Sequence, residues 1–499
     1  MTKSTTSLYD LNSLLRVANV VICGLSIYLY YIKDDNDLVN IFTLFLLGLF
    51  AIENIWMLSY EKRRRNPFIL ILVLVVTVFY MARIATILHI PTSASLFQTA
   101  FITTAKDLNY ALIFILLSNA SMFLGFYIGR KNNIIRKNIT FSDDPVPKVH
   151  NAIIIIIPCV LVQFFNVLNP EAFGRLTGYV QGIIYNQQII LLFTFTLLAY
   201  HYNKISLRIR TLFIVMILAI IILITLSGSR AGVLSMGMFL LMGILAVKQR
   251  IMISKKVILI CLIMVPISMS FFVTATFKRQ LGITKKVSVE HLYLAKEDEI
   301  FDFNRIEDYL AAIYYRLAFL DYSTVLIANR QNFAKIINVQ YYVESIVDNV
   351  LTPGFDVFGT ARASYALSYV RIGLPIPHKD QIKEAYQSDQ MGIYGEYYVL
   401  FYGYPALAVF FFLAFMFQRA FVSFKTTNVL LFCLYRAVLL NLFYIYMNSF
   451  GTDWFLLDIV AAVITTFLFA RYYVSNRKRK IDLQLESKKD AGTYVCKVI

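Results

Sequence analysis

The chain has 499 residues, of which 59% are hydrophobic and only 15% are charged. With a mean hydropathy of +0.65, it has too little polar surface to cover a soluble globule of its size, so the composition excludes a soluble enzyme and indicates a polytopic membrane protein. The formal net charge of +17 would suggest a nucleic-acid partner only if the basic residues gathered on one exposed surface.

Apolar runs long enough to cross roughly 30 Å of hydrocarbon as helices recur along the chain. They are too long and too evenly apolar for the alternating strands of a membrane barrel. We therefore expect an all-α integral membrane fold with twelve transmembrane helices. The expected spans are Leu14–Ile32, Leu38–Tyr60, Pro67–Ile90, Leu108–Gly129, Asn151–Leu168, Ile183–Tyr202, Thr211–Leu226, Ala231–Val247, Val257–Phe277, Gly392–Phe417, Val429–Ser449 and Trp454–Tyr472.

Basic residues fall in every second connection between these spans. With the N-terminus in the cytoplasm, the cytoplasmic connections and both termini hold 28 of the 47 lysines and arginines. The long connection 278–391 carries 13 basic and 14 acidic residues, and this near-neutral segment belongs outside. The basic surplus therefore reflects topology, and we expect no nucleic-acid partner. The chain divides into helices one to nine (1–277), an external helical loop (278–391), helices ten to twelve (392–472) and a basic cytoplasmic tail (473–499).

The external loop has helical signals of its own. Apolar residues recur at three- and four-residue spacing in Phe303–Arg330, which predicts one helix. Gln340–Leu351 predicts a second helix, stopped by a Pro-Gly pair, and Thr360–Val370 a third. Leu374–His378 contains too much proline for regular structure. We expect these helices to form a cap on the outer mouth of the bundle.

Ionisable residues inside spans mark cavities or ion pairs, because a charge is costly in hydrocarbon. Arg83 and Asp458 lie toward the outer ends of the third and last spans, so Arg83 is either functional or part of a structural ion pair, for which Asp458 is a candidate partner. Glu53 and Arg436 lie nearer the cytoplasmic ends, and for both a structural role is favoured.

A Ser-Gly-Ser-Arg-Ala-Gly turn joins the seventh and eighth spans on the outer side. Its small residues, Ser229 among them, let the backbone approach a ligand, and the next helix starts with free N–H groups. Arg230 beside this helix start therefore predicts an anion site, although a tight helix hairpin also needs small residues.

The loop adds further arginines outside the membrane, namely Arg305, Arg316, Arg362 and Arg371. Guanidinium groups bind phosphate in a bidentate manner and keep their charge, so converging arginines can hold a diphosphate. We expect no metal or other cofactor, because the sequence has no His-Glu-x-x-His motif and no Cys/His cluster with ligand spacing. A general base must then come from one of a few external side chains, which are His291, His378, Asp321, Glu384 and Glu396.

Three stretches resemble the Wzy-type O-antigen and capsule polymerases, which are related to the O-antigen ligases. They are the turn LSGSRAG, the arginine-bearing loop, and the loop exit MGIYGEYY with the following FYGYP. Loop arginines of that family are described in an Arg-(ten residues)-Gly pattern, which Arg362 and Gly373 match.

The resemblance implies a bacterial inner-membrane glycosyltransferase. It would transfer a growing glycan from polyprenyl pyrophosphate to a new lipid-linked repeat unit, building O-antigen of lipopolysaccharide or capsular polysaccharide. Its partners would be the lipid-linked oligosaccharides, the bilayer, a chain-length regulator and a flippase. Arg230, Arg316 and Arg83 would stabilise the diphosphate leaving group with help from Ser229, and Arg362 and Arg371 would steer the glycans. Glu396 is the preferred base, with His378 and Asp321 as alternatives.

Two other functions stay open. An O-antigen ligase, or another glycosyltransferase acting on lipid-linked sugars, needs the same bundle and the same arginines, and differs in its acceptor. A flippase or transporter of lipid-linked glycans also has about twelve spans. A transporter places charge along a central path between inverted repeats, whereas here the charge gathers in one external loop.

Overall fold

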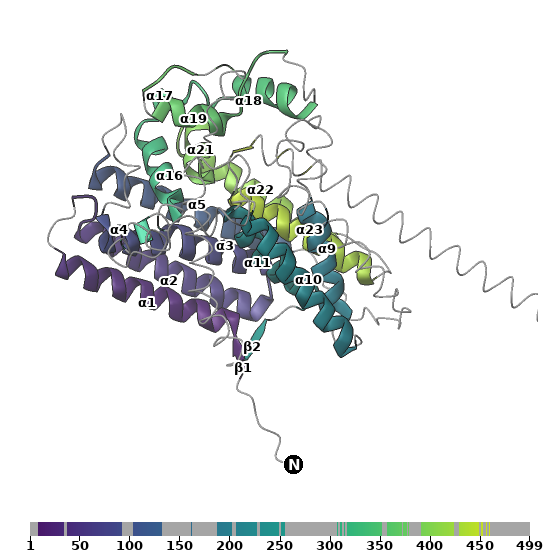
Figure 1. Cartoon of the computed structure of the whole chain (residues 1–499). Helices are drawn as coiled ribbons and strands as arrows, with labels where there is room; N and C mark the ends of the chain where they lie inside the picture. Colours follow the sequence, from purple (N-terminus) through teal and green to yellow (C-terminus); the bar gives the residue numbers. More distant parts are fainter. Residues whose placement is uncertain are drawn as a thin grey trace, which may run out of the picture.

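A computed structural model shows a mostly helical protein (Figure 1). It describes residues 8–33, 37–91, 103–131, 187–201, 206–226, 230–248, 251–254, 317–351, 357–371, 373–376, 391–423 and 429–448, together with the single residues 161, 307, 310, 311, 314, 378, 451, 452, 456 and 459.

The first four expected spans are present as helices, each within a few residues of its predicted bounds. Polar caps set where they start: Asn40 and Thr43 form a capping box, and Asn66 caps a helix that has Pro67 in its first turn. The third span continues through one π-helical turn, η1 (Thr77–Met81), and Pro67–His89 forms one apolar helical span. The helices are α1 (Leu11–Ile32), α2 (Ile41–Arg64), α3 (Pro67–Val76) with α4 (Ala82–His89), and α5 (Ala105–Lys131).

Four later helices also match expected spans: α9 (Gln187–His201), α10 (Leu207–Leu226), α11 (Arg230–Val247) and α23 (Val429–Met447). Val257–Phe277 and nearly all of the spans expected at 151–168 and 454–472 lie outside the described residues. Within the described part, five helices are long and apolar enough to cross a membrane, so the protein is a helical membrane protein. Twelve spans stay a prediction.

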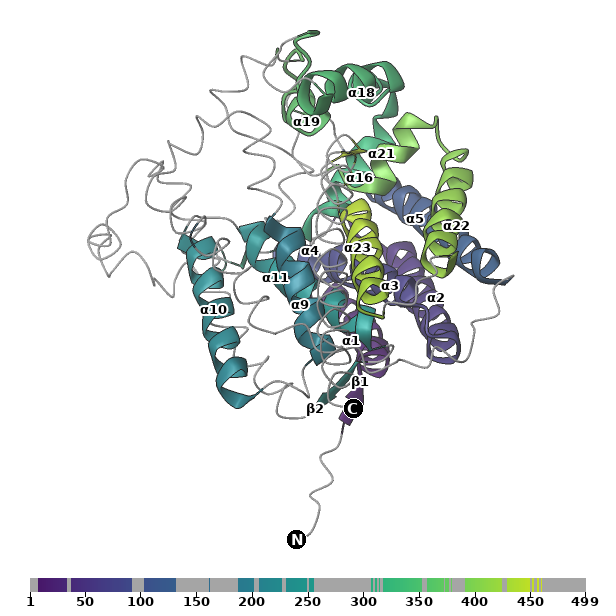
Figure 2. The ribbon, with the colours of Figure 1, turned by 90° about the vertical axis from the view of Figure 1, so that its right-hand side faces the viewer.

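One short antiparallel sheet joins two cytoplasmic segments of the predicted topology. Strand β1 (Leu8–Asp10) pairs with β2 (Met252–Ser254), with Tyr9 opposite Ile253. This sheet was not predicted from the sequence, for which we expected an all-α fold. Because β1 precedes α1 and β2 follows α11, the pairing places the start of α1 and the end of α11 at the same side of the bundle, visible at its lower end in Figure 2. This agrees with the predicted alternation of spans.

The predicted tenth span, Gly392–Phe417, is wrong as a single helix. The chain forms a short α21 (Ile393–Leu400), a turn, and then α22 (Ala406–Ser423). Two successive residues of the turn have positive φ, 57° at Tyr402 and 102° at Gly403, and Pro405 follows directly. Proline lacks an N–H and cannot continue a helix in which its amide would be bonded, so the apolar run breaks here despite its hydropathy.

Gly403 is predicted to be necessary for this turn. Gly403→Ala is expected to destabilise the protein by about 1–2 kcal/mol, because a Cβ disfavours the left-handed region even though the nearest atoms leave room for it. Gly237→Ala is the matched control: this helical glycine has open space around it, and alanine there should stabilise by up to about 1 kcal/mol. Thermal unfolding in detergent measures both, and equal melting temperatures would contradict the prediction.

Helix α22 packs closely along α5, and α5 also packs against α21. Gly125 and Gly129 of α5 face α22: a Cβ on Gly125 would collide with the Phe411 carbonyl, and a Cβ on Gly129 would lie 3.0 Å from Gln418 Cβ. Small residues four apart let two membrane helices approach closely. The pair α5–α22 therefore provides a rigid base on which the external loop rests.

The segment 278–391, the external loop of the predicted topology, contains several short helices in its described part: α16 (Phe319–Ala328), α17 (Arg330–Phe333), α18 (Val339–Ile346), the π-helical η6 (Val347–Leu351) and α19 (Ala363–Arg371). The predictions for 340–351 and 360–370 are confirmed. The single helix expected over 303–330 is wrong: α16 begins only at Phe319, after a turn at 317–318, and ends at Ala328, where Asn329 separates it from α17. Leu374–Ile376 has no regular structure, as predicted.

The loop is more than a cap. Every residue from Phe319 to Ile327 is buried, and α16 packs against α21, α5 and η1, whereas α17, α18 and α19 lie at the upper end of the molecule in Figure 1. Phe319 meets Phe79 edge to face with ring centroids 5.0 Å apart. Part of the loop thus belongs to the core of the bundle.

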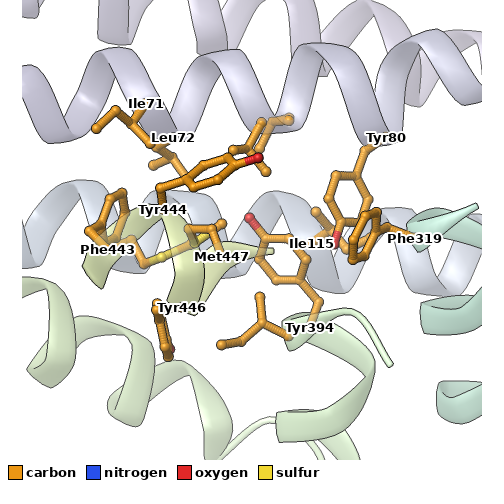
Figure 3. Packing of buried hydrophobic residues seen from close by; sticks show 14 of the residues in the cluster. Ile71, Leu72, Tyr80, Ile115, Phe319, Tyr394, Phe443, Tyr444, Tyr446 and Met447 are labelled. Carbon is orange, nitrogen blue, oxygen red and sulfur yellow. The ribbon is translucent and has the colours of Figure 1, made fainter. Parts of the chain in front are cut away.

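Aromatic side chains from the transmembrane helices, from α16 and from α21 meet in the core (Figure 3). Tyr80 of η1 and Tyr394 of α21 meet edge to face with centroids 5.1 Å apart, and Phe443 of α23 packs in the same way on Phe68 at 5.3 Å. Such edge-to-face pairs add about 0.5–1.5 kcal/mol beyond the area that they bury. The core therefore fixes α21 and α16 relative to the transmembrane helices.

Candidate functional site

A buried ion pair fastens the external loop to the third predicted span. Arg83 Nε donates to Asp321 Oδ1 at 2.8 Å, and Nη2 lies 2.6 Å from Oδ2, so the pair is bidentate. Both side chains are 0% exposed. Arg83 Nη1 also donates to Thr86 Oγ1 and to the carbonyl of Tyr314, each at 3.2 Å. A saturated, fully buried pair of this kind holds structure together, so Arg83 and Asp321 are poor candidates for leaving-group stabilisation and for proton transfer.

Glu396 connects three separate parts of the chain. It is 0% exposed, and its Oε1 accepts from the hydroxyl of Tyr342 at 2.6 Å and from the N–H and hydroxyl of Thr452 at 2.8 and 2.6 Å. Tyr342 belongs to α18 of the loop, and Thr452 follows α23. Burial and these three donors fit a residue that positions elements, so the base preferred from the sequence lies inside the protein.

Glycines bring the helix that carries Glu396 against the loop. A Cβ on Gly395 would lie 2.8 Å from Ser323 Cα, and one on Gly392 would lie 2.8 Å from Ser323 Oγ. Gly392 also has φ of 65°, which favours glycine. The segment MGIYGEYY therefore needs its glycines because α21 packs directly on α16.

The arginine-bearing part of the loop is organised around Asp348. This buried carboxylate accepts from the backbone N–H groups of Val357 and Phe358, at 3.1 Å each, and of Thr360 at 2.8 Å. Thr360 pairs with His378 in an isolated antiparallel bridge. These contacts give the segment that precedes Arg362 a fixed backbone.

His378 lies over Gly359, next to the bridge between Thr360 and His378. A Cβ on Gly359 would collide with the His378 ring, and Gly359 has φ of 67°, so no other residue type fits without moving the imidazole. The side chain of His378 itself is exposed. Of the predicted bases that the structure describes, His378 alone is accessible to a substrate.

Asp348→Ala is predicted to loosen this segment. The substitution leaves three N–H groups without their acceptor. Thr360 is buried, so its N–H should cost about 1–3 kcal/mol, whereas Val357 and Phe358 are exposed residues whose N–H groups cost less. Limited proteolysis should then cut 351–378 faster than in the wild type, with the transmembrane helices intact. Gln340→Ala, on the exposed face of α18, is the control and should leave the cleavage rate unchanged. Wild-type protection of Asp348→Ala would contradict the prediction.

The Arg-(ten residues)-Gly spacing corresponds to the length of helix α19. The carbonyl of Arg362 accepts the first helical N–H groups, from Tyr365 at 2.9 Å and Ala366 at 3.1 Å. Gly373 ends the helix with φ of 77°, and the bonds Gly373 N to Val370 O and Leu374 N to Tyr369 O form a Schellman cap. Arg362 and Arg371 therefore stand at opposite ends of one short helix.

An exposed aromatic surface lies beside this region, at the turn between α21 and α22. Tyr402 is 71% exposed, and the Arg330 guanidinium of α17 lies 5.8 Å from its ring centroid. Behind it, the Tyr110 and Tyr398 hydroxyls lie 2.9 Å apart, and Tyr404 packs against both rings. Exposed tyrosines beside an arginine suit stacking on sugar rings.

The other predicted site residues are placed only in part. Arg230 is the first residue of α11, as expected of an arginine at a helix start. Ser229, Arg316, Arg305, His291, Glu384 and Asp458 lie outside the described residues. The partner found for Arg83 is Asp321, not the Asp458 suggested by the sequence.

Two intramembrane residues have structural surroundings, as favoured. The Arg436 guanidinium lies 4.4 Å from the ring centroid of Phe421 and 5.3 Å from that of Phe432. Such cation–π contacts offset part of the cost of burying the charge. Glu53 of α2 lies beside Asn119 of α5.

Sequence reasoning missed Tyr342, Asp348 and Thr452. Asp348 alone gave a signal, since it is the last acidic residue before the Pro-Gly stop, five positions before the proline. Among the described residues, no three His, Cys, Asp or Glu side chains are grouped closely enough to hold a metal ion.

The chain matches no family model, no curated protein sequence and no solved structure.

Proposed function

We propose that this protein is a polymerase of lipid-linked oligosaccharide repeat units in a bacterial inner membrane. In this reaction the anomeric carbon of the growing glycan leaves its polyprenyl pyrophosphate, and a hydroxyl of the incoming repeat unit attacks it. A glycosidic C–O bond forms, the bond to the diphosphate breaks, and the hydroxyl proton passes to a base. The diphosphate leaves with its negative charge, which arginines can stabilise.

One observation carries the proposal: the segment by which the chain resembles the polymerases, 391–405, is the one that fastens the arginine-bearing loop to the membrane bundle. Its glycines let α21 pack on α16, and Glu396 binds Tyr342 of α18. The turn that follows presents Tyr402 beside Arg330. Residues of the resemblance and residues of the loop thus build one connected region.

We divide the roles by the accessibility of those side chains that the structure describes. Arg83, Asp321 and Glu396 are buried and paired, and we assign them to the scaffold. Arg362 and Arg371, at the start and the end of α19, are left to bind the diphosphate and the glycans, together with Arg230 and Arg316, which keep the roles that the sequence predicts for them. His378 is exposed and becomes the preferred base, while Tyr402 and Tyr404 would stack on sugar rings.

The test is polymerisation by the purified full-length chain in nanodiscs, supplied with a polyprenyl-pyrophosphate-linked repeat unit. The wild type should convert it into a ladder of longer chains. Arg230→Ala should lower the rate by about 10²–10³-fold, the usual effect of removing one group that stabilises a developing charge. Arg208→Ala, an exposed arginine at the start of α10, is the matched control and should polymerise normally.

The same assay separates the alternatives. Normal ladders from both Arg230→Ala and Arg316→Ala would exclude the proposed arginine roles. Transfer to an acceptor without a lipid diphosphate, abolished by His378→Ala, would indicate a ligase. Repeat units that stay unchanged but cross the membrane would indicate transport and overturn the polymerase proposal.

A further inference from the structure

The surface beside the turn between α21 and α22 brings together side chains from separate parts of the chain. Tyr110 comes from α5 and Arg330 from α17, while Tyr402 and Tyr404 belong to the turn, with Tyr398 of α21 behind them. Tyr110, Tyr402 and Tyr404 are 38%, 71% and 43% exposed, whereas Tyr398 is buried. Three aromatic residues therefore reach the surface at one place beside an arginine. We call Tyr110, Arg330, Tyr402 and Tyr404 the Tyr402 surface.

The rings of Tyr110, Tyr398 and Tyr404 support one another. Each pair meets edge to face, with centroids 6.1 to 6.4 Å apart, and Phe114 packs on Tyr398 at 4.8 Å. The Tyr110 and Tyr398 hydroxyls lie 2.9 Å apart, and the Tyr404 hydroxyl also bonds to Tyr110. These contacts fix the rings before a ligand arrives, which lowers the entropy that binding costs.

Tyr402 stands in an unfavourable backbone conformation. Its φ is 57°, in the left-handed region that residues with a bulky side chain rarely adopt. Strain of this kind gathers at binding sites, where the surrounding structure maintains it. Packing in the core does not explain the position of the ring, because the residue is largely exposed. The strain therefore presents an aromatic ring to something outside the protein.

Arg330 supplies a positive charge that the described residues do not balance. Its guanidinium lies 5.8 Å from the Tyr402 ring centroid, and its charge acts on the Tyr110 hydroxyl. Among the described residues Arg330 forms no ion pair, and Asp107, one turn before Tyr110 on α5, accepts from Thr104 instead. The guanidinium is thus placed beside exposed rings with its hydrogen-bonding edge available to an anion.

We propose that the Tyr402 surface binds a sugar that carries a carboxylate, with Tyr402 stacking on the sugar ring and Arg330 binding the carboxylate. The inference rests on the proposed function for the oligosaccharide nature of the ligand. A guanidinium binds a carboxylate through two parallel hydrogen bonds. A neutral sugar would leave Arg330 without a counter-charge, and a lipid phosphate would leave the exposed tyrosines without a ring to stack on. The repeat unit would therefore contain a uronic acid or another acidic sugar.

The test is binding of soluble disaccharides to the full-length protein in phosphatidylcholine nanodiscs, followed by ligand-observed NMR titration. The probes are uronic-acid disaccharides of gluco, galacto and manno configuration. Each is paired with its carboxyl-reduced form, in which a hydroxymethyl group replaces the carboxylate. At least one uronate should bind about tenfold more tightly than its reduced form, the factor that one charge-assisted hydrogen bond supplies. Equal binding within every pair would overturn the proposal.

Two variants separate the charge from the stacking. Arg330→Gln should abolish the preference for the uronate while the reduced form binds as before. Tyr402→Ala should weaken both forms by a similar factor, about two- to tenfold, because it removes one stacked ring. Lys335→Gln, which removes another exposed charge of the external loop, is the matched control and should bind like the wild type. A preference that survives Arg330→Gln would overturn the role of this residue.

Lipid phosphate is the rival occupant of Arg330. Nanodiscs that contain phosphatidylglycerol supply this anion at the membrane surface, and about 0.3 M salt screens the surface charge that they add. The preference for the uronate should persist there. Its loss would mean that a lipid phosphate occupies Arg330, and would overturn the proposal. Binding needs no turnover, so a protein that prefers uronates but makes no polymer would contradict the proposed function alone, and a polymerase without the preference would contradict this inference alone.

Discussion

Replacing Asp321 by alanine is expected to destabilise the protein by about 3–5 kcal/mol, because it leaves the buried Arg83 guanidinium without its counter-charge. The pair has two hydrogen bonds of 2.8 and 2.6 Å, and neither side chain is exposed to solvent. The loop helix α16 should then separate from η1 and α5. The measurements are the melting temperature in detergent and the rate of proteolysis in 317–351.

The double variant Arg83→Met with Asp321→Leu makes the prediction specific. Replacing both members of a buried ion pair by apolar residues of similar volume is often neutral or stabilising, so this variant should recover most of the lost stability. Asp107→Ala, which removes a partly exposed carboxylate that accepts from the N–H and hydroxyl of Thr104 at the start of α5, is the control and should cost no more than about 1 kcal/mol. A wild-type melting temperature for Asp321→Ala would contradict the structural role.

The same double variant shows whether Arg83 and Asp321 have a structural or a catalytic role. If it folds and polymerises, Arg83 does not bind the diphosphate and Asp321 is not the base. If it folds but makes no polymer, the pair has a catalytic role that its burial conceals. Activity and stability must therefore be measured on the same preparation.

Hydropathy predicted most of the apolar helices that the structure describes to within a few residues. Hydropathy predicts membrane helices well because each backbone polar group in the hydrocarbon must find its hydrogen-bond partner within its own helix. It failed at 392–417, where apolarity continues through a break. The signal was present in Gly403 and Pro405, but a hydropathy window averages over the local chemistry that ends a helix.

The site was less predictable because its contacts join distant parts of the chain. Arg83 and Asp321 are 238 positions apart, and no periodicity connects them. Arg83 was expected to be either functional or part of a structural ion pair, and its pairing supports the second reading, whereas Asp321 was expected as an alternative base and is instead the partner of Arg83. Likewise, the Arg-(ten residues)-Gly spacing looked like a substrate-binding pattern. In the structure, the ten residues between Arg362 and Gly373 contain helix α19 and its C-terminal end.

Glu396 gives the second large prediction. Glu396→Ala removes the acceptor for Tyr342 and Thr452, at about 1–3 kcal/mol for each buried donor left unsatisfied. It should therefore release α18 from α21 and abolish polymerisation. Tyr342→Phe removes only one of the three donors and should cost about 1 kcal/mol with polymerisation largely kept.

Glu396→Gln separates a positioning role from proton transfer. Glutamine keeps a carbonyl oxygen that accepts the same donors but cannot take a proton from a sugar hydroxyl. If Glu396 positions elements, Glu396→Gln should polymerise within about tenfold of the wild type, because loss of a general base costs about 10²–10⁴-fold. If the Glu396→Gln protein is folded but loses activity by that factor, Glu396 is the base. The loop would then have to move, because Tyr342 and Thr452 enclose the Glu396 carboxylate and an acceptor hydroxyl must reach it.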